Sequence, residues 1–489
     1  MVTRAGLRAM PNPRLLLCGA MAENQYTIHS TWLDSNRALP SRFIRPVLQF
    51  TRIEAAGGFI LLIAAAIAVV WANSPWYESY FALFDHHISL DLGLVHIDES
   101  VKHLINDGLM AVFFFVVGLE IKRELVVGEL NSVKKAALPA MAALGGMIVP
   151  AGIYIAIVLL GGASEATHGW GIPMATDIAF SVGIVALLGS RVSVGAKLFL
   201  LALAIVDDIG AIIVIAVFYT DDLNWWYLLG GVVGLVAIYL ARRAGIWSLL
   251  FYVPIAFVVW ELFLESGVHA TIAGVTLGLM TPVRPKYTNE EFREKAVAVL
   301  ERWDTNRASP DAEARLDQDA LELAAVAKAS VSPLERLEHA LHPWSSFVVV
   351  PLFALANAGV RFIGHEETLL DQILSPVALA VAVGLLVGKP VGITLATWLG
   401  VRFNMGQLPR RTTMKTVVGL GTLAGVGFTV SLFVTELAFS SPILADEAKL
   451  GIFIGSGFAA VLGYVLLRRL RTPQERYDEA LESLSEKGN

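Results

Sequence analysis

Long apolar segments alternate with short polar connections from about residue 50 almost to the C-terminus. Each segment is close to the roughly 20 residues that a helix needs to cross about 30 Å of hydrocarbon. Membrane-spanning strands would be shorter and would alternate polar with apolar positions, so the pattern predicts helices. The expected spans are twelve, at residues 53–73, 103–121, 136–160, 171–189, 196–219, 225–241, 247–264, 267–282, 340–359, 374–400, 414–438 and 448–467.

The composition agrees with an all-α polytopic membrane protein. The chain has 489 residues, of which 55% are hydrophobic and 16% are charged, and its mean hydropathy is +0.63. These values exclude a soluble globular domain. Membrane lipid is therefore the expected surrounding, and no nucleic-acid partner is expected.

Basic residues fall on alternate sides of these spans, as the positive-inside rule requires. They lie in the N-terminal tail and after even-numbered spans: Arg4, Arg8, Arg14, Arg37, Arg42, Arg45, Arg52, Lys122, Arg123, Lys134, Lys135, Arg191, Arg242, Arg243, Arg410 and Arg411. The opposite connections are mainly acidic: Glu78, Asp85, Asp91, Asp98, Glu165, Asp221 and Asp222. Arg361 and Lys449 depart from the rule. Both termini are therefore expected to be cytoplasmic.

The ends of the chain are expected to be cytoplasmic extensions, residues 1–50 and 471–489, which flank a membrane domain of residues 51–470. The Leu-rich run at 14–20 is too short for the apolar core of a secretion signal. A later start is an alternative for part of the N-terminal extension. The single cysteine, Cys18, excludes a disulfide within one chain.

Two polar pieces interrupt the membrane pattern. Within residues 75–100, hydrophobic and polar residues alternate on both sides of Gly93, which predicts a two-stranded hairpin outside the membrane. An isolated hairpin is only marginally stable, so it is expected to pair with another chain; a simple loop is the alternative. The charged residues 283–334 contain amphipathic stretches at 290–303 and 311–329, which predicts a solvated cytoplasmic insert.

Two adjacent carboxylates, Asp207 and Asp208, lie inside an otherwise apolar run from Leu198 to Phe218. An ionisable group inside a spanning segment costs about 3 kcal/mol or more, so it is retained where an ion pathway, a proton relay or a required ion pair depends on it. The pair therefore indicates ion transport. A buried structural network is the alternative.

Several motifs follow one another in the order found in a known family. They are residues 118–125 (GLEIKREL), 175–180 (ATDIAF), 202–212 (ALAIVDDIGAI), 267–271 (GVHAT), 336–344 (RLEHALHPW) and 388–390 (GKP). On these motifs the chain closely resembles the NhaA-type Na+/H+ antiporters. The resemblance implies a bacterial inner-membrane antiporter of twelve helices, with the inverted-topology repeats known for this family and a homodimer formed through the periplasmic hairpin.

The resemblance also implies the activity. Na+ or Li+ would leave the cytoplasm in exchange for external protons, at two protons per Na+ ion, and so support pH and sodium homeostasis and salt tolerance. Such a protein is a secondary active transporter, not an enzyme, and needs no cofactor beyond the ions that it carries. The sequence has no Walker motif, in agreement with transport without ATP.

A dehydrated Na+ ion prefers several hard oxygen ligands. Asp207, Asp208 and the hydroxyl of Thr176 could supply carboxylate and hydroxyl oxygens. Backbone carbonyls become available where a spanning helix is broken beside a cavity. Such breaks are expected in the fourth span, where Pro173 precedes Thr176, and in the eleventh span, which has four glycines within residues 419–427. These spans are the centres of the triplets three to five and ten to twelve, as an inverted repeat requires.

Charged residues should compensate the partial charges at the inner ends of broken helices. Asp177 has the sign to offset facing N-termini and Lys389 the sign to offset facing C-termini; a purely structural role is the alternative for both. Asp207 and Asp208 diverge by about 100° around their helix and should have different roles. We expect Asp208 to be the principal ion ligand and proton carrier. We expect Asp207 to contact the ion and to alternate with a salt bridge to Lys389, which the resemblance also implies.

Burial and mutual repulsion should favour the protonated form of at least one of these carboxylates, so that a proton and Na+ compete for one site. The main rival class is an intramembrane aspartyl protease. Its two carboxylates must come from separate helices, and the chain lacks the GxGD sequence of that class. A cation channel or a K+-selective exchanger remains an alternative, which coupling of each cation to proton movement would distinguish.

Six ionisable residues lie at the cytoplasmic ends of the second and ninth spans, where the resemblance implies a pH sensor: Glu120, Arg123, Glu124, Glu338, His339 and His342. Histidine titrates in the relevant range. Helix orientation and snorkelling of long side chains are the alternative roles. The insert directly before Glu338 departs from the compact connection of the family, which puts pH regulation in question.

Overall fold

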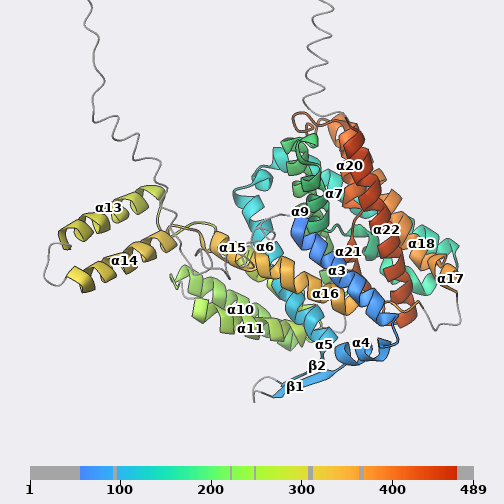
Figure 1. Cartoon of the computed structure of the whole chain (residues 1–489), viewed down its shortest axis with the longest axis horizontal. Coiled ribbons are helices and arrows are strands. Elements are labelled where there is room, and N and C mark those ends of the chain that lie inside the picture. The colour runs from blue at the N-terminus through green and yellow to red at the C-terminus, as the bar shows by residue number, and fades with distance from the viewer. Residues whose placement is uncertain are drawn as a thin grey trace, which may run out of the picture. The chain divides into compact units, whose positions relative to one another are not determined.

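The computed structural model describes residues 55–91, 96–220, 223–246, 249–306, 312–362 and 368–470. The two predicted extensions and Cys18 lie outside these ranges. Helices dominate the described residues (Figure 1). In chain order they are α3 (Ala55–Ala72), α4 (Tyr77–Phe84), α5 (Val101–His103), η3 (Leu104–Leu109), α6 (Met110–Val126), η4 (Glu129–Asn131), α7 (Val133–Leu160), η5 (Ser164–Met174), α8 (Ile178–Leu187), η6 (Gly189–Arg191), α9 (Val194–Phe218), α10 (Trp225–Arg243), α11 (Leu249–Leu264), α12 (Ala270–Met280), α13 (Asn289–Asn306), α14 (Ala312–Ala329), α15 (Pro333–Trp344), η7 (Ser345–Val349), α16 (Val350–Asn357), α17 (Leu369–Ile373), α18 (Pro376–Val383), η8 (Gly384–Gly388), α19 (Lys389–Arg402), α20 (Met414–Ala424), α21 (Phe428–Ala438) and α22 (Pro442–Arg469).

Every segment predicted to cross the membrane contains helix. Within the described ranges, seven continuous helical runs are long and apolar enough to span: Val101–Val126, Val133–Leu160, Val194–Phe218, Trp225–Arg243, Pro333–Asn357, Pro376–Arg402 and Pro442–Arg469. The number rises to ten if each of three bent helix pairs is one span, and α11 and α12 are apolar but shorter. The chain is therefore a helical, multi-pass membrane protein.

Two of the bent pairs are helices interrupted midway. η5 and α8 are separated by residues 175–177 and bend by 45°, and α20 and α21 are separated by residues 425–427 and bend by 49°. Pro173 and Gly425 mark the two breaks. Pro173, in the last turn of η5, has no backbone N–H to donate within a helix. At Gly425 the backbone passes so close to α18–α19 that an added Cβ would meet the carbonyl oxygen of Leu385.

Packing divides the membrane helices into two groups. The first helix group comprises α3, α5–α6, α10–α12 and α15–α16, in which α6 packs on α12 and α3 packs on α16. The second helix group comprises α7–α9 and α18–α22, in which α7 packs on α19 and α22 packs on α18 and α20. Gly145 and Gly392 let α7 and α19 approach closely, because a Cβ on either would meet the other's backbone carbonyl. We call the boundary between the groups the seam; α3 meets α8 there, α16 meets α21 and α6 meets α9.

A two-stranded sheet precedes α5. β1 (His87–Asp91) pairs antiparallel with β2 (His96–Ser100), with His87 opposite Ser100 and Asp91 opposite His96. β2 leads directly into α5 (Figure 1). We call this end of the helices the hairpin end.

The insert between α12 and α15 forms a pair of helices. α13 and α14 pack on each other (Figure 1), and Nε of Arg302 lies 3.5 Å from the carboxylate of Asp319 between them. We call the end of the membrane helices at which α12 stops and α15 starts the insert end.

Three aromatic side chains close the seam on the hairpin side: Phe114 of α6, Phe353 of α16 and Phe433 of α21. The ring centroids of Phe114 and Phe433 are 5.4 Å apart, and those of Phe353 and Phe433 are 6.1 Å apart. All three side chains are almost completely buried. Aromatic pairs at these separations are attractive beyond the apolar area that they bury.

The two basic residues that depart from the charge alternation both have partners. The guanidinium of Arg361 lies 4.0 Å from the ring centroid of Tyr77, a cation–π contact. The ammonium of Lys449 is buried and lies 2.8 Å from the carboxylate of Glu436. Local interactions, rather than helix orientation, account for both positions.

Candidate functional site

The candidate site is built from three elements of the second helix group. α9 carries Asp207 and Asp208, and the break between η5 and α8 carries Thr176 and Asp177. Lys389 is the first residue of α19, directly after the π-helical turn η8. Single π-helical turns inside α-helices often occur at functional sites. All five side chains are buried, with at most 7% of Asp208 exposed.

The two helix breaks are hydrogen-bonded to each other. The backbone N–H of Asp177 donates to the carbonyl of Val426 at 2.7 Å, and the hydroxyl of Thr176 donates to the carbonyl of Ala424 at 2.9 Å. An interrupted helix leaves such carbonyls without their usual partners. Each break therefore satisfies backbone groups that the other one exposes.

A reciprocal pair of serines repeats this arrangement. Ser181 of α8 donates to the carbonyl of Leu423 at 2.9 Å, and Ser431 of α21 donates to the carbonyl of Ile172 at 2.8 Å. In both cases a hydroxyl in the helix after one break bonds the helix before the other break. The hydrogen bonds between the two breaks therefore follow the same pattern in both directions. We call the place where the two breaks meet the crossing.

Asp177 lies at the N-termini of two helices. Its Oδ1 accepts from the backbone N–H of Phe180 at 3.2 Å as the N-cap of α8. Its Oδ2 accepts from the backbone N–H of Thr429 in α21 at 3.2 Å and also from the Thr429 hydroxyl. A carboxylate at this position stabilises both N-termini, because their free N–H groups carry partial positive charge.

Lys389 joins the crossing to the carboxylates of α9. Its Nζ donates to Oδ2 of Asp207 at 2.5 Å and to the Thr176 hydroxyl at 2.6 Å. The lysine reaches the C-terminal end of α20 through Thr176, which bonds Ala424, rather than by direct contact. Removing either charge of so buried a pair would leave the other uncompensated. Oδ1 of Asp207 is also buried and has no hydrogen-bond partner.

Negative charge exceeds positive charge around Asp208. The charges that act on it are the carboxylates of Asp207, Glu120 and Asp177 and the ammonium of Lys389. A buried surplus of carboxylates favours uptake of a cation or a proton. Within the described ranges no three or more His, Cys, Asp and Glu side chains are grouped as a metal centre. Two carboxylates with neighbouring hydroxyl and carbonyl oxygens form a hard donor set that suits an alkali ion.

Part of the predicted pH sensor forms an ion-pair cluster at the insert end. Arg123 of α6 is hydrogen-bonded to the carboxylate of Glu338 in α15. Its guanidinium lies 3.7 Å from Glu124, which accepts the backbone N–H of Glu129 at 3.0 Å. The cluster links two helices of the first group.

The remaining sensor residues lie on the same two helices. Nε2 of His342 is 4.0 Å from the carboxylate of Glu120, which is 24% exposed. Glu120 is also one of the charges that act on Asp208. His339 lies exposed on α15. Glu120 therefore links the charged residues at the insert end to the buried carboxylates of α9.

Reasoning from the sequence missed Thr429, Ser181 and Ser431. A signal was present for the serines, because each lies four residues beyond a break, after Asp177 and after Gly427 respectively. Hydroxyls at matched positions in two interrupted helices indicate reciprocal bonding only once both breaks are located.

The chain matches one family over most of its length. A family model described as Na+/H+ antiporter 1 matches residues 48–467. A Myxococcus xanthus protein named Na(+)/H(+) antiporter NhaA 2 is 46% identical over 432 residues, which cover 88% of this chain and 91% of the relative.

Two further relatives carry related names. The Na(+)/H(+) antiporter NhaA 2 of Syntrophotalea carbinolica is 45% identical over 430 residues, or 87% of this chain and 96% of the relative. The Na(+)/H(+) antiporter NhaA of Rhodopirellula baltica is 44% identical over 428 residues, or 87% of this chain and 94% of the relative.

Proposed function

The chain belongs to the Na+/H+ antiporter 1 family, and from that membership we propose that Asp207 and Asp208 form the site at which Na+ and protons are exchanged. Its activity is Na+/H+ antiport, and like its family it is a secondary transporter rather than an enzyme. One observation carries the site proposal. A buried Lys389–Asp207 ion pair lies beside a second buried carboxylate on α9, next to the crossing of two helix breaks.

Asp208 is the principal ligand and proton carrier in this proposal. Asp207 offers its unpartnered Oδ1, and the hydroxyl of Thr176 accepts a hydrogen bond from the same Lys389 ammonium. These oxygens, with backbone carbonyls of the breaks, replace the water that Na+ loses on entry. Asp177 stabilises the two N-termini of the crossing and takes no part in binding the ion.

Exchange follows from competition for the same oxygens. Na+ arriving at the site displaces the proton of Asp208 and replaces the Lys389 ammonium at Asp207; Lys389, no longer paired with a carboxylate in its buried position, then gives up a second proton. When Na+ leaves, Asp208 and Lys389 each take up a proton and Asp207 pairs with Lys389 again. The buried site therefore never holds two ionised carboxylates without a compensating cation, a state that would be costly. The ions themselves supply all the chemistry, so no further cofactor is needed.

The architecture we propose has twelve spans, with the fourth and eleventh discontinuous. The reciprocal hydrogen bonds between the two breaks support an inverted repeat of spans three to five and ten to twelve. Both termini face the cytoplasm of a bacterial cell with the protein in its inner membrane, following the distribution of basic residues. The hairpin end is then periplasmic and the insert end cytoplasmic.

The partners we propose are membrane lipid and a second copy of the chain, paired through the β1–β2 hairpin. The cluster of Arg123, Glu338 and Glu124 with Glu120 and His342 is proposed as the pH sensor, because it lies at the cytoplasmic end and its Glu120 acts on Asp208. The α13–α14 insert enters α15 directly before this cluster.

The stoichiometry we propose is the two protons per Na+ ion of the family, in support of salt tolerance and pH homeostasis. Each cycle then carries net charge inward, and a membrane potential contributes about 2.3 kcal/mol per charge per 100 mV. An inside-negative potential on oriented vesicles should accelerate Na+ efflux. A rate indifferent to voltage, with equal Na+ and proton counts, would instead support one-for-one exchange.

Vesicles that contain a pH-sensitive dye test the site. Adding Na+ or Li+ to energised vesicles with the wild-type protein should cause release of protons from the vesicle interior, which dissipates the proton gradient, whereas K+ should not. The double variant Asp207→Asn, Asp208→Asn should show no release. Asp317→Asn, an equivalent change at an exposed position of α14, should behave as wild type. Normal release by the double variant would contradict the site assignment.

A further inference from the structure

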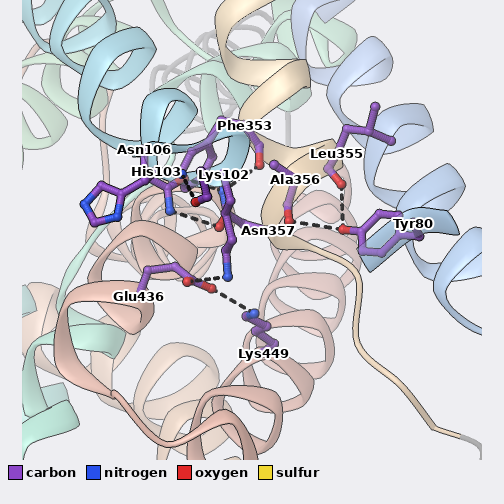
Figure 2. A network of polar contacts seen from close by, with 11 residues as sticks. Tyr80, Lys102, His103, Asn106, Phe353, Leu355, Ala356, Asn357, Glu436 and Lys449 are labelled. Carbon is purple, nitrogen blue, oxygen red and sulfur yellow. Dashed lines mark hydrogen bonds and ion pairs between the residues drawn. The ribbon is translucent and has the colours of Figure 1, made fainter. Parts of the chain in front are cut away.

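Three charged side chains meet at the hairpin end. Nζ of Lys102 lies 2.7 Å from Oε2 of Glu436, and Nζ of Lys449 lies 2.8 Å from Oε1 of the same carboxylate (Figure 2). Lys102 is in α5 of the first helix group, whereas Glu436 in α21 and Lys449 in α22 belong to the second. The Lys102–Glu436 ion pair therefore crosses the seam, and the Glu436–Lys449 pair does not.

Burial decreases across this cluster toward Lys102. The side chains of Lys449, Glu436 and Lys102 are 6%, 16% and 31% exposed. If the seam opens, Lys449 still neutralises Glu436, and Lys102 can be hydrated. Separating the groups therefore leaves no buried charge without a partner, which is the step that makes most buried ion pairs costly to break.

The first helix group is held together beside Lys102 by uncharged hydrogen bonds. Asn106, four residues after Lys102, exchanges two side-chain hydrogen bonds with Asn357 of α16, at 2.7 and 3.2 Å (Figure 2). The hydroxyl of Tyr80 in α4 donates to the carbonyl of Leu355 at 2.7 Å. These contacts join η3 to α16 within the first group and attach α4 to α16, so this end of the first group can move as one unit.

The ion pair lies at the edge of the aromatic closure of the seam. Phe433 is three residues before Glu436 in α21, and it packs against Phe114 and Phe353 of the first group. At the insert end, by contrast, the Arg123–Glu338 ion pair joins two helices of the same group.

We propose that Lys102 and Glu436 form a latch that holds the seam closed at the hairpin end and separates once in each transport cycle. Its release lets the aromatic closure part and exposes the Asp207–Asp208 site to the hairpin side. This inference rests on the proposed function, because it concerns access to that exchange site. Lys449 is the residue that compensates the negative charge of Glu436 while the latch is open.

Cross-linking tests whether the two sides of the latch must separate. Cys18→Ser removes the single native cysteine, and Lys449→Met avoids leaving that buried ammonium without its carboxylate. Lys102→Cys with Glu436→Cys then allows a bifunctional thiol reagent with a reducible bridge to join the groups. Exchange in vesicles should be present before cross-linking, lost after it and restored by reduction. The control, Asn106→Cys with Asn357→Cys in the same background, joins two helices of the first group only. It should keep its exchange when cross-linked.

Unchanged exchange by the cross-linked Lys102→Cys, Glu436→Cys protein would overturn the latch. Equal losses of exchange in the latch and control proteins would also overturn it, because joining any two helices would then be enough to stop transport. Both outcomes differ from a failure of the proposed function, in which Na+-dependent proton release is missing from the wild type before any reagent is added.

Two lysine variants provide an independent measurement that needs no cross-linking. Lys102→Met breaks the pair across the seam, whereas Lys449→Met breaks the pair within the second group. Without the latch, the site should be open to the hairpin side more of the time. The apparent KM for Na+ on that side should fall by about fivefold relative to the insert side in Lys102→Met. The same shift in Lys449→Met, or no shift in Lys102→Met, would contradict the proposal.

Discussion

Two buried charge clusters in this antiporter have opposite compositions. Around α9, the single ammonium of Lys389 is outnumbered by the carboxylates of Asp207 and Asp208, and all three side chains are nearly inaccessible. At the hairpin end, two lysines share the single carboxylate of Glu436, and exposure rises to 31% at Lys102. The first cluster lies within one helix group, and the second crosses the seam.

This difference separates binding from gating. A surplus of carboxylates leaves a place for one more positive charge, which Na+ or a proton can fill. A surplus of lysines makes one ion pair dispensable, because the carboxylate keeps a partner when the other leaves. Charge balance, rather than the mere presence of buried ions, therefore distinguishes a transport site from a contact between moving parts.

Asp208→Asn is expected to have the largest effect. The amide cannot carry the exchanged proton, so Na+-dependent proton release in vesicles should fall to the level of protein-free vesicles while the variant still folds and inserts. Asp317→Asn is the control at an exposed position. Substantial exchange by Asp208→Asn would place the proton carrier elsewhere.

Lys389→Ala should cause the largest loss of stability. It leaves Asp207 buried without its partner, at a cost of about 3–5 kcal/mol, and the melting temperature of the purified protein in detergent should fall accordingly. Lys449→Ala should lower it less, because Glu436 keeps Lys102. Equal melting temperatures for Lys389→Ala and wild type would refute the proposed difference between the clusters.

Asp207→Asn should weaken ion binding without removing the proton carrier. Loss of one charged ligand is expected to raise the apparent KM for Na+ by about tenfold, which corresponds to about 1.4 kcal/mol. The variant also leaves Lys389 without its ion-pair partner. An unchanged KM, measured by dye dequenching over a range of Na+ concentrations, would leave Asp208 as the only carboxylate that contacts the ion.

Lys102→Met should have the smallest effect on stability. The side chain is partly exposed and Glu436 keeps Lys449, so the loss should be no more than about 1 kcal/mol. A melting temperature as low as that of Lys389→Ala would mean that the pair across the seam is structural rather than separable.

The carboxylates of the proposed exchange site could be singled out from the sequence, because few features place charge inside an apolar helix. Asp207 and Asp208 interrupt an apolar run, and Pro173 with a cluster of glycines locates the two breaks. The bonds across the breaks could not be predicted. A hydroxyl in a membrane helix commonly bonds the carbonyl one turn earlier in its own helix, as Thr435 does with Ser431, and only the folded structure shows which hydroxyls cross.

The proposed latch could not be predicted from the sequence either. Lys102 and Glu436 each resemble an ordinary charge near a helix end, and they are brought together only by the packing of the two helix groups. Lys449 counted as an exception to the rule that orients the helices. Its burial against Glu436 shows that the exception had a local cause.

Proton release on Na+ binding tests the central claim most directly. Purified wild-type protein in weakly buffered detergent solution should release protons when Na+ or Li+ is added, with saturation as the site fills, and it should release none with K+. Asp208→Asn should abolish the release, and Asp317→Asn should leave it unchanged. Saturable Na+ binding to the wild type without any proton release would show that the two ions do not compete at Asp207 and Asp208, and would contradict the account.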